Sequence, residues 1–298
     1  MGLFCRRFPR SILMLALCFP FPSSPAAQTT GAKEAYSPAS LDGQYSMHDL
    51  FARLDGGGLI RYGWRIYDGV GEVGHQEAVP WMFFTLAYDV DADGRLSYSE
   101  GAYTGSVGLD GRLAAHSRYA VKDEDAHLPS GYSGFRISVQ RSPAEIDNAA
   151  FSGTYRYHAL VALGNDNWRT IAGFVAADGA GEFTLTRGGL DTVDHTYAVQ
   201  DNGMTVIDGQ NGVFATIIPT GDVLFQTVDV GESRDPSIPE GYEGLAIYVR
   251  RGTGVTAEDF AGTYRIHEVR VQSDRAHVAG VGTVNASGNG VYNGTIER

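Results

Sequence analysis

Short runs of alternating apolar and polar residues fill this chain, and turn residues separate them. The runs are rich in Val, Ile, Thr, Tyr and Phe, and Asp-Gly, Asn-Gly, Thr-Gly and Gly-x-Gly stretches lie between them. Alternation with period two is typical of half-buried strands, and these dipeptides favour hairpin turns with positive φ. No helix of convincing length is predicted. The pattern therefore indicates an all-β protein built from antiparallel hairpins.

The pattern recurs along the chain as an internal repeat. The decamer LDGQYSMHDL from Leu41 returns as FSGTYRYHAL from Phe151 and as FAGTYRIHEV from Phe260, at spacings of 110 and 109 residues. We therefore expect two complete β units and one partial unit. Their expected boundaries are 41–150, 151–259 and 260–298.

Each complete unit is expected to form one closed barrel. The second unit predicts eight strands, near 153–162, 169–177, 181–187, 193–200, 203–208, 212–218, 222–229 and 243–251. Eight consecutive antiparallel strands favour an up-and-down barrel, because closure removes the exposed edges of an open sheet. The predicted architecture is two tandem antiparallel up-and-down meanders, each an eight-stranded barrel, plus a partial third repeat. Blades of a β-propeller are the alternative.

The first predicted strand of each unit carries Gly-x-Tyr, at Tyr45, Tyr155 and Tyr264. In a meander of this length, the motif resembles the first strand of lipocalin and avidin-like (calycin) barrels, where Trp replaces the Tyr. The resemblance implies a barrel whose mouth binds a small apolar molecule. From the residues alone, we expect the tyrosine ring to fill the barrel base and the glycine to admit a close neighbouring strand.

The N-terminus reads as a secretory signal peptide over residues 1–27. Three arginines precede an apolar run from Ile12 to Phe21, and small residues follow it. The run is shorter than the roughly 20 residues of a membrane span. Leu17 before Cys18 disfavours a lipoprotein anchor. Residues 28–40 are expected to be a polar tether, and the location is expected to be secreted or periplasmic.

Charge and cysteine content narrow the candidate partners. Both cysteines lie inside the expected signal, and its removal leaves 20 basic against 35 acidic side chains, a formal charge of −15. Such a surface disfavours nucleic acid and anionic lipid as partners. The scarcity of lysine beside abundant Arg, Gly and Ala suggests a bacterial source with a GC-rich genome. The composition does not predict an oligomeric state.

The stretch DVDADGRLSYSE, residues 89–100, matches the ligand pattern of an EF-hand calcium loop. The candidate calcium ligands are Asp89, Asp91, Asp93, the carbonyl of Arg95, and Glu100. One observation opposes a calcium site, and a second opposes an EF-hand domain around it. The second unit has Ala198, Gln200 and Asn202 at the aspartate positions, and PWMFFTLAY before the loop predicts a strand, whereas an EF-hand begins with a helix. Calcium remains the one candidate cofactor.

Two further sets of residues are candidate ligand contacts. The cluster PWMFF, which contains Trp81, Phe83 and Phe84, occurs only in the first unit, where it either packs a core or lines an apolar pocket. His48, His158 and His267 recur in the decamer. Their recurrence favours a structural role at the surface or mouth, with ligand binding by His48 and His158 as the alternative.

The sequence contains no nucleophile elbow, zincin motif or phosphate loop, and no catalytic residue is predicted. The leading hypothesis is a secreted non-enzymatic repeat protein that binds a small molecule or surface component. The alternatives are a calcium-binding secreted protein that uses the acidic hairpin, and a barrel enzyme of isomerase or hydrolase type. An apolar cavity beneath residues 81–84 favours the first hypothesis, and a buried His–carboxylate pair favours the enzyme.

Overall fold

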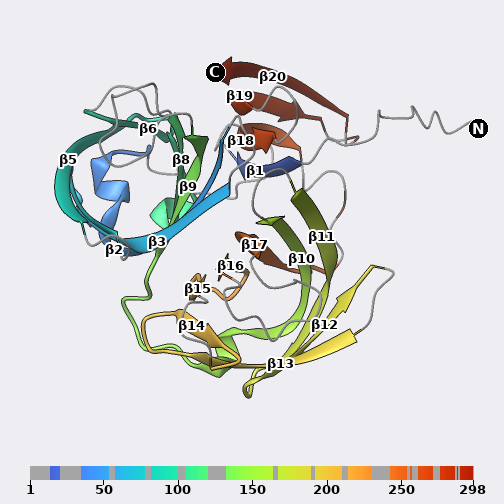
Figure 1. The fold of residues 1–298 in the computed structure, drawn as a ribbon. Coiled ribbons are helices and arrows are strands. Elements are labelled where there is room, and N and C mark those ends of the chain that lie inside the picture. Colours follow the sequence, from blue (N-terminus) through green and yellow to red (C-terminus); the bar gives the residue numbers. More distant parts are fainter. Residues whose placement is uncertain are drawn as a thin grey trace, which may run out of the picture.

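Two closed eight-stranded antiparallel barrels and one four-stranded sheet make up the described part of the chain (Figure 1). The computed structural model describes residues 14–20, 35–53, 58–77, 82–99, 105–119, 132–163, 167–188, 192–209, 214–229, 242–253, 256, 261–270, 276–285, 287 and 289–297. Three short 3₁₀ helices accompany the strands. The all-β prediction is confirmed.

The first barrel consists of strands β2 to β9, each paired with its neighbours in sequence and closed by pairing of β2 with β9. The strands are β2 Asp42–Arg53, β3 Gly58–Asp68, β4 Glu72–Glu77, β5 Met82–Val90, β6 Arg95–Tyr98, β7 Gly105–Gly108, β8 Leu113–Tyr119 and β9 Tyr132–Gln140.

The second barrel repeats this order with strands β10 to β17, and β10 pairs with β17. The strands are β10 Ser152–Leu163, β11 Asn167–Asp178, β12 Glu182–Arg187, β13 Thr192–Val199, β14 Met204–Ile207, β15 Phe214–Ile217, β16 Val223–Asp229 and β17 Tyr242–Arg250. All eight predicted strands are confirmed within about two residues, and the propeller alternative is wrong.

The third sheet contains the partial repeat and a strand from the N-terminus. Its order is β1-β18-β19-β20, with β1 Met14–Pro20, β18 Gly262–Arg270, β19 Ala276–Val284 and β20 Gly290–Glu297. Leu17 lies opposite His267. Ile137 and Ile247 lie opposite the other two repeat histidines in the same way. Strand β1 therefore takes the place that the eighth strand occupies in each barrel.

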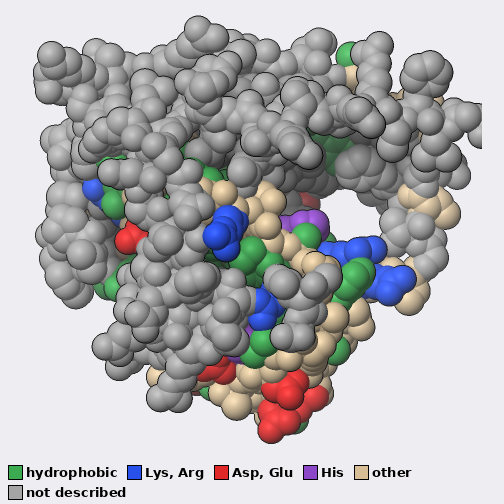
Figure 2. Space-filling view, turned by 45° about the vertical axis from the view of Figure 1, so that its right-hand side comes forward, with side chains coloured by type: hydrophobic (Ala, Val, Ile, Leu, Met, Phe, Trp, Pro, Cys, Tyr) green, Lys and Arg blue, Asp and Glu red, His purple; other side chains and the backbone are tan. Residues whose placement is uncertain are grey.

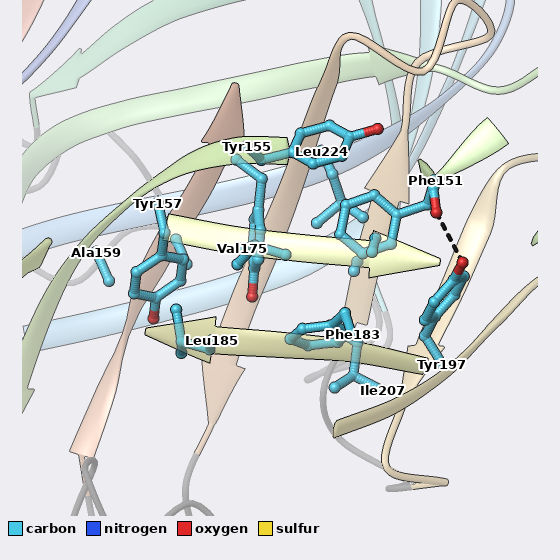
Figure 3. Packing of buried hydrophobic residues seen from close by; sticks show 14 of the residues in the cluster. Phe151, Tyr155, Tyr157, Ala159, Val175, Phe183, Leu185, Tyr197, Ile207 and Leu224 are labelled. Atoms are coloured by element: carbon cyan, nitrogen blue, oxygen red, sulfur yellow. Dashed lines mark hydrogen bonds between the residues drawn. The ribbon is translucent and has the colours of Figure 1, made fainter. Parts of the chain in front are cut away.

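A 3₁₀ helix closes the base of each barrel: η1 Pro38–Ser40 in the first and η3 Asn148–Ala150 in the second. The Tyr88 hydroxyl donates to the carbonyls of Pro38 (3.0 Å) and Leu41 (2.9 Å). The Tyr197 hydroxyl donates to the Phe151 carbonyl at 2.7 Å, the dashed contact of Figure 3. Residues 35–40, expected as tether, are thus part of the barrel base.

The Gly-x-Tyr tyrosines also serve the barrel bases, as predicted. Tyr45 and Tyr155 are fully buried, and their hydroxyls donate to the carbonyls of Gly111 (2.7 Å) and Gly221 (2.9 Å). The prediction for the glycine is wrong. A Cβ on Gly43 would meet no atom within 4 Å, and its φ of +99° explains the residue, because L side chains rarely adopt that conformation.

The barrels pack against one another through their outer faces. Leu50 and Ile137 of the first barrel lie in one apolar cluster with Leu160, Phe225 and Ile247 of the second. Figure 2 shows hydrophobic, basic and histidine side chains side by side on part of the described surface, with acidic side chains gathered at its lower end. Within the described ranges, no helix is long and apolar enough to cross a membrane.

Candidate functional site

The aromatic candidates on β5 face opposite ways. Phe83 points outward and is 71% exposed, whereas Phe84 is half-buried and stacks on the His75 ring at a centroid distance of 4.4 Å. Trp81 lies outside the described residues. Phe84 thus packs against an imidazole of the barrel interior, and an apolar pocket beneath this strand stays a prediction.

The two candidate histidines lie on outer faces of the barrels. His48 is 1% exposed, with Nδ1 2.8 Å from the Thr227 hydroxyl and Nε2 3.1 Å from the Thr216 hydroxyl of the second barrel. Burial lowers the pKa of His48 to about 4, with a smaller opposing effect of Asp49. His158 is exposed on the outer face of β10.

The acidic stretch forms the hairpin between β5 and β6. Asp91 Oδ1 accepts hydrogen bonds from the backbone nitrogens of Asp93 (3.0 Å) and Arg95 (2.8 Å), so this carboxylate caps the turn. Asp89 is exposed on β5, and Glu100 lies outside the described residues. Among residues that the structure describes, no three His, Cys, Asp or Glu side chains converge as a metal site.

The interior of the first barrel holds a charged cluster that the sequence analysis did not predict. Asp49 on β2 and Arg136 on β9 form a bidentate ion pair, and both side chains are 0% exposed. His75 Nδ1 on β4 lies 3.2 Å from Arg136 Nη1 and accepts from Arg65 Nε on β3 at 3.0 Å. His75 therefore carries its proton on Nε2 in this geometry.

Two phenols continue the cluster beyond Arg65. Arg65 Nη1 donates to the hydroxyls of Tyr67 (3.0 Å) and Tyr98 (2.6 Å), which lie 2.8 Å apart. Burial raises the pKa of Tyr98 well above its ordinary value although the Arg65 charge opposes the rise, so Tyr98 stays neutral. Among the described side chains, no carboxylate forms an ion pair with Arg65, which is 1% exposed.

The second barrel has an apolar interior at the same positions. Figure 3 shows Ala159, Val175, Leu185 and Ile207 within one packed cluster. In the first barrel, the positions of these four residues are taken, in the same order, by Asp49, Arg65, His75 and Tyr98. Arg136 takes the position of Ala246. Because the same fold closes around apolar side chains, barrel formation does not require the charged cluster. Burying each ion costs several kcal/mol unless it is well paired, so closure of the barrel alone does not account for this cluster.

The repeat alignment contained the signal for this cluster. Asp49 is four positions after Tyr45 on one strand, and side chains at even spacing share a face, so an inward carboxylate was deducible. The aligned residue in the second unit is Ala159. A charged residue that replaces an apolar one on the inward face of a repeat marks a site that the repeat itself does not need.

A His–carboxylate pair lies among the described residues of the second barrel, with the His195 side chain 7% and the Asp208 side chain 24% exposed. His195 Nδ1 lies 2.7 Å from Asp208 Oδ2, and the His195 ring stacks on Phe183 at 4.8 Å. Asp208 has a φ of +53° and also accepts from the Thr196 backbone nitrogen at 2.8 Å. Because the Asp208 side chain is partly exposed, this pair is not the buried His–carboxylate pair that would favour a barrel enzyme.

A pocket of about 230 Å³ lies between the barrels. Tyr62 and Phe214 stack across it at 3.7 Å, and His48 and Arg141 also line it. Arg141 contacts the Trp64 ring at 5.9 Å, and desolvation lowers its pKa. The pocket lies between the outer faces of the two barrels, whereas the charged cluster lies inside the first barrel.

Comparisons with known proteins add little. No family model matches the chain, and no curated protein matches it significantly. One similar solved structure is a protein of unknown function of the DUF3598 family from Nostoc punctiforme, at 10% identity and a TM-score of 0.21, covering 87% of this chain and 96% of that one. A TM-score this low supports no inference about the fold or the function of the chain. What is established for the chain is a repeat of antiparallel eight-stranded barrels.

Proposed function

We propose that the first barrel binds a small anionic molecule through Arg65, and that the protein is a secreted binding protein. The single observation behind the proposal is that the Arg65 guanidinium is 1% exposed and hydrogen-bonded to neutral groups. An unpaired buried cation is costly, and proteins pair such groups or hold a counter-ion. A bound carboxylate or phosphate would supply the missing negative charge.

The chemistry of the surrounding groups supports an anion more than an apolar ligand. A guanidinium presents a planar fork of donors that matches carboxylate and phosphate oxygens. Arg136 is neutralised by Asp49, and His75 accepts from Arg65, so the cluster formed by these four residues has one excess positive charge. The ring of Phe84 stacks on His75 and offers an apolar wall for the body of a ligand.

The test is native mass spectrometry of the protein purified without denaturation, followed by identification of released small molecules in negative-ion mode. We expect an organic anion at near one equivalent in the parent and its loss in Arg65→Val, which reproduces Val175 of the second barrel. Val175→Ile is the matched control and should keep the anion.

A second arm covers a ligand that is lost during purification. Inorganic phosphate, benzoate and octanoate are titrated while the unfolding temperature is followed. A bound anion raises this temperature in the parent and leaves Arg65→Val unchanged. The proposal fails if the parent carries no anion and none of the three probes stabilises it, or if Arg65→Val binds as the parent does.

A further inference from the structure

Two of the three repeat histidines make the same contact with a neighbouring unit. His48 of the first unit lies against Thr216 through Nε2 and Thr227 through Nδ1. His267 of the third unit lies against Ser106 through Nε2 (2.9 Å) and Ser117 through Nδ1 (3.2 Å) of the first barrel.

The hydroxyls themselves occupy equivalent places. Ser106 and Thr216 are 110 residues apart, and each lies on the sixth strand of its barrel. Ser117 and Thr227 are also 110 residues apart, and each lies on the seventh strand. A neutral imidazole satisfies both its nitrogens with two hydroxyls, one donating and one accepting. The first unit thus docks on the second, and the third docks on the first, through one shared interface.

On the second unit, Leu160 and Ile247 of this docking side pack against the first barrel, and the described residues leave the part around His158 uncovered. His158 is exposed, Val249 is 44% exposed and Phe174 is 39% exposed. In the first unit, the counterpart of the histidine is His48, which the second barrel covers to 1% exposure, and the counterpart of the valine is Val139, which is 0% exposed in the apolar cluster that the two barrels share.

We propose that the face formed by His158, Phe174 and Val249 docks the outer face of another barrel of this repeat, carried on a separate chain. The occupant presents a Ser or Thr hydroxyl on each of two adjacent antiparallel strands, spaced as Thr216 and Thr227 are. Uncovered apolar side chains around a hydrogen-bonding centre are typical of such interfaces.

A second copy of this chain does not fit as the occupant. Both hydroxyl pairs in its described residues are already bound, one by its own His48 and the other by its own His267.

The first measurement is labelling of the full chain with diethyl pyrocarbonate, read residue by residue by mass spectrometry. His158 should be modified at least tenfold faster than His48 and His267, which serve as internal controls. The probe for docking is the full chain extended after Arg298 by a copy of residues 189–253, which carries the threonine pair. In this extended chain His158 should become as protected as His48.

The matched control is the same extension with valine at both threonine positions, which should leave His158 at least severalfold more reactive than the threonine version. Reactive His158 in a folded threonine extension overturns the proposal. Protection of His158 that grows with the concentration of the unextended chain also overturns it, because the occupant would then be a second copy.

Stability of the unextended chain tests the face without any extension. Val249→Ser should leave the unfolding temperature unchanged, whereas the counterpart Val139→Ser should lower it by about 5 °C. Equal losses from the two substitutions would mean that the His158 face is already packed, and would overturn the proposal.

Discussion

At the residue scale, the two barrels differ in what they bury. The ion pair of Asp49 and Arg136 lies where Ala159 and Ala246 lie in the second barrel. A buried ion pair is weak evidence for stability, since apolar side chains of similar volume often serve as well, but loss of one partner strands the other charge. The pair therefore holds Arg136 beside His75 at a cost that the second barrel avoids.

Asp49→Ala is predicted to lower the free energy of unfolding by about 3–5 kcal/mol, because it leaves Arg136 buried without its carboxylate. The double variant Asp49→Ala with Arg136→Ala, which restores the second-barrel residues, should be less destabilised than the single variant. Urea denaturation measures both. A double variant as unstable as the sum of the two single ones would contradict a direct energetic coupling.

His48 is predicted to make the protein less stable in acid. Its pKa is about 4 in the folded protein because of burial, against about 6.5 in an unfolded chain, so the unfolded state binds the proton more readily. Its contribution is complete above about pH 6.5 and is lost as the pH falls to about 4, to the extent of about 3 kcal/mol. His48→Asn should flatten this part of the stability profile. An identical pH slope in parent and variant would exclude His48 as the cause.

At the element scale, the number of strands and their bounds were largely predictable because they depend on local patterns. Turn dipeptides and alternation placed all eight strands of the second barrel. The charged cluster was less accessible, because Arg136 and Asp49 are 87 residues apart and meet only through barrel closure. The inward orientation of Asp49 could be deduced from its even spacing to Tyr45. The contact between Arg65, His75 and Arg136 could be predicted only with knowledge of the register across several strands.

The β5–β6 hairpin gives a prediction at the same scale. Asp91→Ala should lower the free energy of unfolding by about 1 kcal/mol in calcium-free buffer, because Asp91 accepts from two backbone nitrogens of the turn. Asp93→Ala, at an exposed position of the same turn, is the matched control and should change stability by less than about 0.5 kcal/mol. Chemical denaturation with a chelator present gives both values, and equal effects would refute the capping role.

At the scale of the whole molecule, the units share their outer contacts and differ inside. The contact of a histidine with two hydroxyls joins the first unit to the second and the third to the first. The recurrence of this histidine in the sequence is thus a structural signal, whereas the charged interior occurs in one barrel. Duplication has kept the surfaces that assemble the units, and one interior has diverged.

The last prediction concerns strand β1, which lies in the segment expected to be removed as a signal peptide. In the full chain, β1 pairs with β18 from Met14 opposite Arg270 to Pro20 opposite Tyr264. Without residues 1–27, the backbone groups on that side of β18 lose these partners, and an open strand edge recruits other strands. Hydrogen exchange of residues 262–270 should therefore be faster in the shortened chain than in the full one. Exchange of β10, the control strand, should have a similar rate in the two chains. Unchanged protection of β18 would mean that another strand takes the place of β1, and a size measurement across protein concentrations would then show whether that strand comes from a second molecule.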